Sequence, residues 1–360
     1  MKRDYVSVTT LFDAIKPETA RPSINESGGS IRRSGAHIGL AERSIFHEPW
    51  WLNAATDENW HQAVVRAGGE IIGEMPYTVS RKSLWRVSYL PPLTRTLGPV
   101  IQWRNEKARG PDWTYRLDVT RELIDQLPKC AHFHQVADPL VSEAEAAAFS
   151  LEGFKVSVQF TLKIPVGVDE ETAWRQLRSK TRNRVRRSFE QFVVQEISSA
   201  DTFVDFYESN LAARDLNNLY GSATMRRLLT EVLRRNAGTM LGAFDNDGSL
   251  SAATALVWDQ SNVYYLLTSR KTTAHGGAVS LLVWHAMRLA RERELELDFD
   301  GVSTPGILKF LAGFGGQLVR RYVFERMRAD YAILRAVRAS SRNLADLVRK
   351  IDRKENTPVE

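Results

Sequence analysis

The chain has 360 residues, of which 43% are hydrophobic and 26% charged, and its formal net charge is +6. This length suits two domains, and the composition is typical of a folded protein with a sizeable core. The single cysteine, Cys130, excludes an internal disulfide framework and a multi-cysteine metal site. No apolar run is long enough for a membrane span and no signal-peptide core is present. We therefore expect a cytoplasmic protein with no metal.

The first part of the chain predicts a lead segment followed by sheet. Residues 17–37 are rich in Pro, Ser, Gly and charge, so residues 1–43 are expected to be mobile. Residues 44–150 are expected to form a first folded half. Within it, Gly68–Gly69 separates two apolar runs and predicts a hairpin. Weaker strands are expected at residues 110–118 and 132–136, with a helix beginning at Thr120 between them.

The second part, residues 151–330, has a clearer order of predicted elements. Three antiparallel strands are separated by turn residues, and a loop, a helix and a last strand follow. The expected elements are a strand at 155–164, helices at 169–192, 200–214 and 223–235, strands at 239–245, 249–258 and 263–269, a helix at 278–293 and a strand at 295–300. Residues 331–360 are expected to be a basic helical tail. Two units of similar order indicate an α/β fold with mixed sheets (α+β) and a duplicated architecture.

Positive charge gathers in residues 175–187, which hold seven basic side chains and no acid. In a continuous helix their apolar neighbours would share one arc, Arg182 and Arg186 would lie on one flank, and Lys180 on the other. Like charges at this density destabilise a helix unless something compensates them. Either internal acidic partners or a bound anion, such as a phosphate, carboxylate or RNA, would do so. We interpret the segment as an anion site.

The loop from Arg270 to Gly277 enters the predicted helix at 278–293. A helix N-terminus presents unpaired N–H groups and a positive dipole, which suit a phosphate or a carbonyl oxygen. Gly276 and Gly277 would allow close approach of the ligand, while Arg270 or His275 would add charge. An ordinary loop is the alternative.

The predicted strand at 295–300 places Glu296, Asp298 and Asp300 on one face. A buried carboxylate there could act as a general base for an amine. The alternative is pairing with arginines, which we expect for Glu296 and Asp300, and Asp298 is the candidate base.

Several segments jointly resemble FemAB-related proteins, a group of GNAT acetyltransferases that includes the BioF2-like proteins. The matching pieces are FHEPWWLNA at 46–54, YLPPLTRTLGP at 89–99, LRSKTRNRVRRS at 177–188, LDFDG at 297–301 and GILKFLAGFGG at 306–316. The resemblance implies a tandem GNAT-like acyltransferase fold over residues 46–324. RKTTAHGGA at 270–278 matches the GNAT donor loop loosely. Lys309 lies one position earlier than the lysine that the family often carries beside the transferred carbonyl.

The resemblance implies transfer of an acyl group from acyl-CoA, or a similar thioester, to an amine on an anionic cell-envelope or polysaccharide precursor. Asp298 would be the base, Tyr264 or Tyr265 the proton donor, and Lys309 a further catalytic candidate. Arg270, His275, Gly276 and Gly277 would bind the donor, while Lys180, Arg182 and Arg186 would hold the acceptor. Two alternatives stay open. Aminoacyl-tRNA could be the donor, a less favoured partner, or the chain could be a degenerate GNAT-like binding module.

Overall fold

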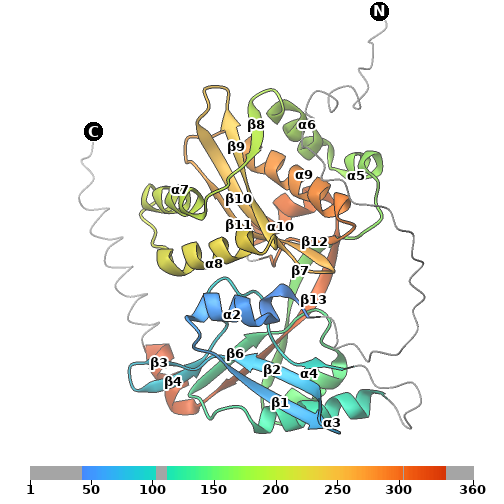
Figure 1. Cartoon of the computed structure of the whole chain (residues 1–360), viewed down its shortest axis with the longest axis vertical. Coiled ribbons are helices and arrows are strands. Elements are labelled where there is room, and N and C mark those ends of the chain that lie inside the picture. Colours follow the sequence, from blue (N-terminus) through green and yellow to red (C-terminus); the bar gives the residue numbers. More distant parts are fainter. Residues whose placement is uncertain (1–42, 103–111, 303, 338–360) are drawn as a thin grey trace, which may run out of the picture. The chain divides into compact units, whose positions relative to one another are not determined.

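The computed structural model describes residues 43–102, 112–302 and 304–337 (Figure 1). The predicted mobile segment lies outside these residues except for Arg43, and so does the predicted tail beyond Val337. Residues 329–337 are helical. In the described residues, no helix is both long and apolar enough to span a membrane.

The elements alternate between helices and strands along the chain. Their bounds are η1 Ile45–His47, α2 Pro49–Thr56, β1 His61–Ala67, β2 Glu70–Tyr77, β3 Ser80–Lys82, β4 Trp85–Ser88, β5 Val100–Ile101, α3 Asp112–Asp125, β6 His132–Val136, α4 Glu143–Leu151, β7 Lys155–Ile164, α5 Glu170–Gln176, α6 Ser179–Ser188, β8 Phe192–Glu196, α7 Ala200–Ala212, α8 Ser222–Arg234, β9 Gly238–Asp245, β10 Leu250–Trp258, β11 Asn262–Arg270, α9 Gly277–Glu292, β12 Glu296–Asp298, α10 Pro305–Leu311, η2 Ala312–Phe314 and β13 Gln317–Met327.

A small sheet has the order β1-β2-β5. The predicted hairpin at Gly68–Gly69 is confirmed: β1 and β2 pair antiparallel, and both glycines have the positive φ that the turn requires. Helix α3 packs on this sheet so closely that a Cβ at Gly73 would lie 2.5 Å from the Val119 side chain. The glycine therefore sets the distance between helix and sheet.

A ten-stranded mixed sheet has the order β3-β4-β6-β13-β7-β12-β11-β10-β9-β8. Its strands come from both predicted halves, and the long antiparallel pair β7 and β13 links them, from Gln317 opposite Lys163 to Glu325 opposite Lys155. The predicted α/β class with mixed sheets is confirmed. The boundary predicted at residue 150 stays a prediction.

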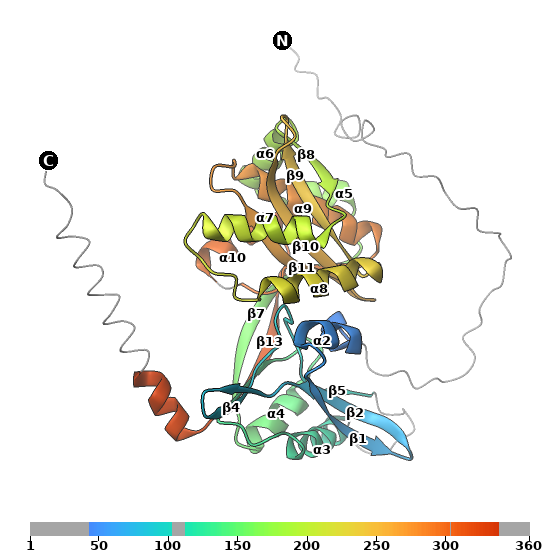
Figure 2. The same cartoon turned by 60° about the vertical axis from the view of Figure 1, so that its left-hand side comes forward.

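Helices cover both faces of β9, β10 and β11 (Figure 2). Alternate strand residues pack into two separate apolar clusters, one with Phe203 of α7 and Leu228 of α8, the other with Leu281 and Trp284 of α9. Helix α9 is apolar almost all round because the sheet lies on one side of it and α5 and α6 lie on the other. The three predicted antiparallel strands and the helix after them are confirmed.

Three local predictions are wrong. Residues 112–118 belong to helix α3, because Val119, Leu123 and Ile124 need one helical face to reach the core. The helix expected over 169–192 is broken at Leu177 and Arg178, whose ψ angles are 135° and 140°. The break allows the Arg178 N–H to donate to the Gly313 carbonyl. The same expected helix overran the first residue of the edge strand β8, which pairs with β9.

Candidate active site

A cavity of about 1010 Å³ lies where β11 and β12 part. These parallel strands pair only from Asn262 opposite Glu296 to Tyr264 opposite Asp298. Beyond that point β11 carries a bulge, because Ala255 and Leu256 of β10 face Leu267 and Tyr265. The carboxyl ends of diverging parallel strands form a crevice that commonly binds ligands. The fold itself therefore creates this opening.

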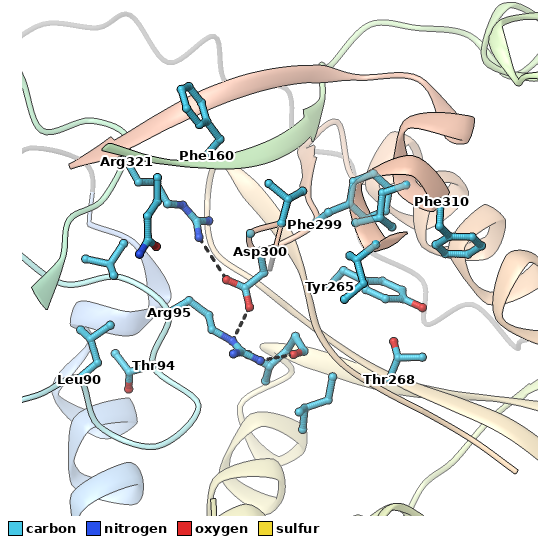
Figure 3. Close-up of a pocket in the computed structure, with 18 of the residues that line it drawn as sticks. Leu90, Thr94, Arg95, Phe160, Tyr265, Thr268, Phe299, Asp300, Phe310 and Arg321 are labelled. Carbon is cyan, nitrogen blue, oxygen red and sulfur yellow. Dashed lines mark hydrogen bonds and ion pairs between the residues drawn. The ribbon is translucent and has the colours of Figure 1, made fainter. Parts of the chain in front are cut away.

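Both predicted halves line the cavity (Figure 3). Its lining residues are Leu90, Thr94, Arg95, Val136, Gln159, Phe160, Tyr220, Tyr265, Leu266, Leu267, Thr268, Val279, Phe299, Asp300, Gly301, Val302, Ile307, Phe310, Leu311 and Arg321. One end is polar and contains Arg95, Asp300 and Arg321. The other end is apolar and is built mainly by α10 and the chain after β12.

Arg95 brings the proline-rich loop at residues 90–99 into the cavity. Its guanidinium forms an ion pair with Asp300, donates to the Leu266 carbonyl at the bulge, and donates to the Tyr220 hydroxyl at 3.3 Å. The loop thus contributes the charge that faces the parted strands.

Asp300 is held between two guanidiniums, with its side chain only 3% exposed (Figure 3). Arg321 Nη1 lies 3.4 Å from its Oδ1. The residue has a φ of 61°, a left-handed conformation uncommon for an L-residue. Burial raises the pKa of Asp300 to about 6, while Arg95 and Arg321 act to lower it and the Asp298 carboxylate acts to raise it. A carboxylate with this pKa can exchange a proton near neutral pH.

Asp298, the base predicted from the sequence, is fully buried and does not line the cavity. It accepts from Arg321 Nη2 at 2.9 Å, from the Thr161 hydroxyl and from the Asp300 N–H at 2.7 Å. The expected pairing of Asp300 with arginine is present, whereas Glu296 pairs with Lys163 Nζ at 3.0 Å. Asp298 thus positions Arg321 and the backbone of Asp300.

The other predicted catalytic residues lie in different places. Tyr265 lines the cavity with its ring 6.0 Å from that of Phe299, and burial raises the pKa of its hydroxyl while the hydroxyls of Thr268 and Thr254 lower it. Tyr264 points to the other side and donates to Asp259 Oδ2 at 2.8 Å. Lys309 is exposed on α10 and does not line the cavity, although Phe310 beside it does.

The predicted donor loop lies at the N-terminus of α9. Arg270 donates to the Ala274 carbonyl within the loop, and the Gly277 N–H donates to Nδ1 of His275 at 3.2 Å. A Cβ at Gly276 would have no neighbour within 4 Å, so this glycine faces open space. Gly277 instead contacts α6.

The basic segment at residues 175–187 forms no ion pair with any carboxylate of the described residues. Across residues 43–102, 112–302 and 304–337, no carboxylate oxygen lies within 4.0 Å of the basic groups of Arg175, Arg178, Lys180, Arg182, Arg184, Arg186 and Arg187. Two arginines of α8, by contrast, are paired: Arg226 with Asp201 and Asp205, and Arg234 with Glu231. The charge on α6 is therefore left for a ligand or for solvent.

Gly277→Ala is expected to lower the free energy of unfolding by about 1–3 kcal/mol, as overpacking of a close contact does. Its Cβ would lie 2.2 Å from Ser188 Oγ, and that hydroxyl is held by the Arg184 carbonyl at 2.8 Å. Urea unfolding measures the loss. The matched variant Gly276→Ala meets open space and should change stability by less than about 0.5 kcal/mol. Equal losses for the two variants would show that the contact with α6 is not tight.

Sequence reasoning missed Arg95 and Arg321 and gave Asp300 only a structural role. Arg95 could have been found, because it is the one charged side chain of the proline-rich loop at residues 89–99, a segment that the sequence analysis had already singled out. No feature of the sequence singles out Arg321.

Comparison with known proteins gives a family match within the second half. Residues 175–304 match the family described as Acetyltransferase (GNAT) domain. A comparison with curated proteins gives no match. Among solved structures, that of FemX is 12% identical, with a TM-score of 0.59 over 79% of this chain and 93% of the other. The C-terminal domain of a protein described as a lysylphosphatidylglycerol synthetase, from Agrobacterium fabrum, is also 12% identical, with a TM-score of 0.51 over 79% and 89%.

Residues 175–304 therefore form a GNAT acetyltransferase domain, which contains the parted strands and supports an N-acyltransferase. The GNAT part of the resemblance read from the sequence is confirmed for these residues, and the fold is similar to that of FemX.

Proposed function

We propose that the protein transfers an acyl group from an acyl thioester such as acyl-CoA to an amine on an anionic cell-envelope or polysaccharide precursor, in the cytoplasm. GNAT domains generally take acyl-CoA as donor, which supports the thioester. The similar folds of FemX and of a protein described as a lysylphosphatidylglycerol synthetase favour an envelope acceptor. The observation that carries the proposal is Asp300, with a pKa of about 6, at the polar end of the cavity between β11 and β12.

The chemistry needs one proton acceptor and one proton donor. A neutral amine attacks the thioester carbonyl carbon, the C–N bond forms, and the amine proton passes to the Asp300 carboxylate. The C–S bond breaks, and the leaving thiolate takes a proton from Tyr265, which its raised pKa keeps protonated. The proton on Asp300 returns to Tyr265 through solvent, so the products are an amide and a free thiol. Asp300 thus takes the role that the sequence suggested for Asp298.

The N-terminus of α9 is the proposed donor site. Gly276 faces open space there, so a phosphate or the thioester carbonyl can approach the start of α9, where the Gly277 N–H would turn from Nδ1 of His275 to the ligand. Arg270 and His275 belong to the same loop. Lys309 has no place in this scheme, because it is exposed outside the cavity.

The acceptor's anionic group is proposed to bind α6 through Lys180, Arg182 and Arg186. Replacing Arg182 and Arg186 together by alanine should raise KM for the acceptor at least about tenfold and leave kcat close to that of the parent, because the lost contacts hold the anion in the ground state and the transition state alike. Steady-state kinetics at low salt measures the effect. Arg234→Ala plus Arg235→Ala is the matched control, since both arginines pair with Glu231 on α8. Unchanged acceptor kinetics in the first variant would remove α6 from the site.

Calorimetric titration with acetyl-CoA, decanoyl-CoA and a charged tRNA tests the donor. Saturable binding of a CoA thioester, weakened by filling the open space at Gly276 with Gly276→Trp, supports the proposal. Binding of tRNA alone would support the second candidate, an aminoacyl-tRNA donor, which the unpaired cations of α6 favour. Binding of neither donor would indicate a degenerate binding module.

A further inference from the structure

The apolar end of the cavity has more surface than a small acyl group needs. Six apolar side chains form it, from the first turn of α9, the segment after β12 and α10. They are Val279, Phe299, Val302, Ile307, Phe310 and Leu311. Ile307 is 41% exposed, and Phe160, which lines the cavity from β7, is 47% exposed. Apolar side chains gathered at the opening of a cavity commonly mark a surface that a ligand covers.

The volume of the cavity also indicates an acyl group larger than acetyl. At about 1010 Å³ the cavity is as large as the pockets that hold whole drug-sized ligands. A two-carbon acetyl group would contact only a small part of these walls and leave the remainder to water. An extended hydrocarbon chain would displace that water and bury the six side chains.

The acyl group is the part of the substrates that reaches this end. Val279 lies in the first turn of α9, next to Gly276 and Gly277, where the thioester is proposed to enter. The opposite end is occupied by the ion-paired groups of Arg95, Asp300 and Arg321, which suit a polar amine. The acyl chain therefore follows the apolar wall while the amine approaches from the charged end.

We propose that the transferred acyl group is a medium or long hydrocarbon chain, seated against α10 and the ends of β11 and β12. The inference rests on the proposed thioester donor and adds its chain-length class. Each methylene moved from water into an apolar site strengthens binding by about fourfold. Even with partial burial, decanoyl-CoA should bind at least about 100-fold more tightly than acetyl-CoA.

The test compares these two thioesters by calorimetry below the micelle concentration of decanoyl-CoA, with the full chain and two variants. Ile307→Trp places a larger side chain at the apolar end. It should weaken decanoyl-CoA binding by about tenfold or more and change acetyl-CoA binding by less than about twofold. Leu318→Trp is the control, because Leu318 is 54% exposed on β13 and does not line the cavity. It should bind both thioesters as the parent does.

Three results would overturn the inference. Equal affinity for acetyl-CoA and decanoyl-CoA, or equal weakening of both by Ile307→Trp, would overturn the chain-length class and leave the thioester donor standing. Binding of no thioester at all would overturn the proposed function together with this inference. Thermal unfolding of Ile307→Trp identifies a misfolded variant, and Val279→Phe, which narrows the same end from α9, then takes its place.

Discussion

Replacing Asp300 by asparagine is expected to lower kcat/KM by about two to three orders of magnitude, because the amine would lose its proton acceptor. Binding of the donor should change little, since asparagine keeps the size of the side chain. In the parent, kcat/KM should fall as the pH drops through about 6, where Asp300 takes up a proton and can no longer accept one. Pre-steady-state and steady-state rates between pH 5 and 8 measure both effects. The asparagine variant should lack this acidic limb.

Glu296→Gln is the control for that experiment. Glu296 is a carboxylate of β12, is paired with Lys163 and does not line the cavity. The Glu296→Gln variant should retain both the rate and the pH profile of the parent. An Asp300→Asn enzyme with the parent's rate, or with the same acidic limb, would rule out Asp300 as the proton acceptor.

Arg321→Met is expected to lower the free energy of unfolding by about 3–5 kcal/mol, because it leaves buried carboxylates with one cation fewer. The Arg321 side chain is 5% exposed and contacts both Asp298 and Asp300. Arg320→Met changes the adjacent residue of the same strand, whose side chain is 38% exposed and pairs with Glu143 near the surface. Solvent screens that pair, so its loss should be at most about 1 kcal/mol. Urea unfolding of the two variants gives the comparison. Similar losses would mean that the buried network adds nothing beyond an ordinary surface ion pair.

The sequence predicted the elements whose signals are local. Strands β9, β10 and β11 follow one another with turn residues between them, and Gly248 has the positive φ that such a turn requires. Helix α9 and its entry loop follow directly. In each case the residues that determine the structure are neighbours in the chain.

Long-range contacts account for what the sequence did not predict. The break between α5 and α6 depends on Gly313, more than 130 residues away, and no local signal at Leu177 indicates it. The cavity joins Arg95, Asp300 and Arg321 through the pairing of β13 with β7 and the insertion of the loop at residues 90–99. The alternation of side chains along the predicted strand placed Asp298 and Asp300 on one face. It did not indicate which of the two carboxylates faces the cavity and which lies behind it.

The positive charge of α6 should affect how fast an anionic substrate associates with the protein. The five cations of α6, a helix roughly 15 Å long, produce a local positive potential, and no described carboxylate lies within 4.0 Å of their charged groups. An anionic substrate would be drawn toward this part of the molecule before any contact forms. Its association would therefore be fast in dilute buffer and would slow as salt shortens the range of the field, while dissociation from the cavity would change much less. The helix would then determine how often productive collisions occur, and the parted strands would determine what happens after them.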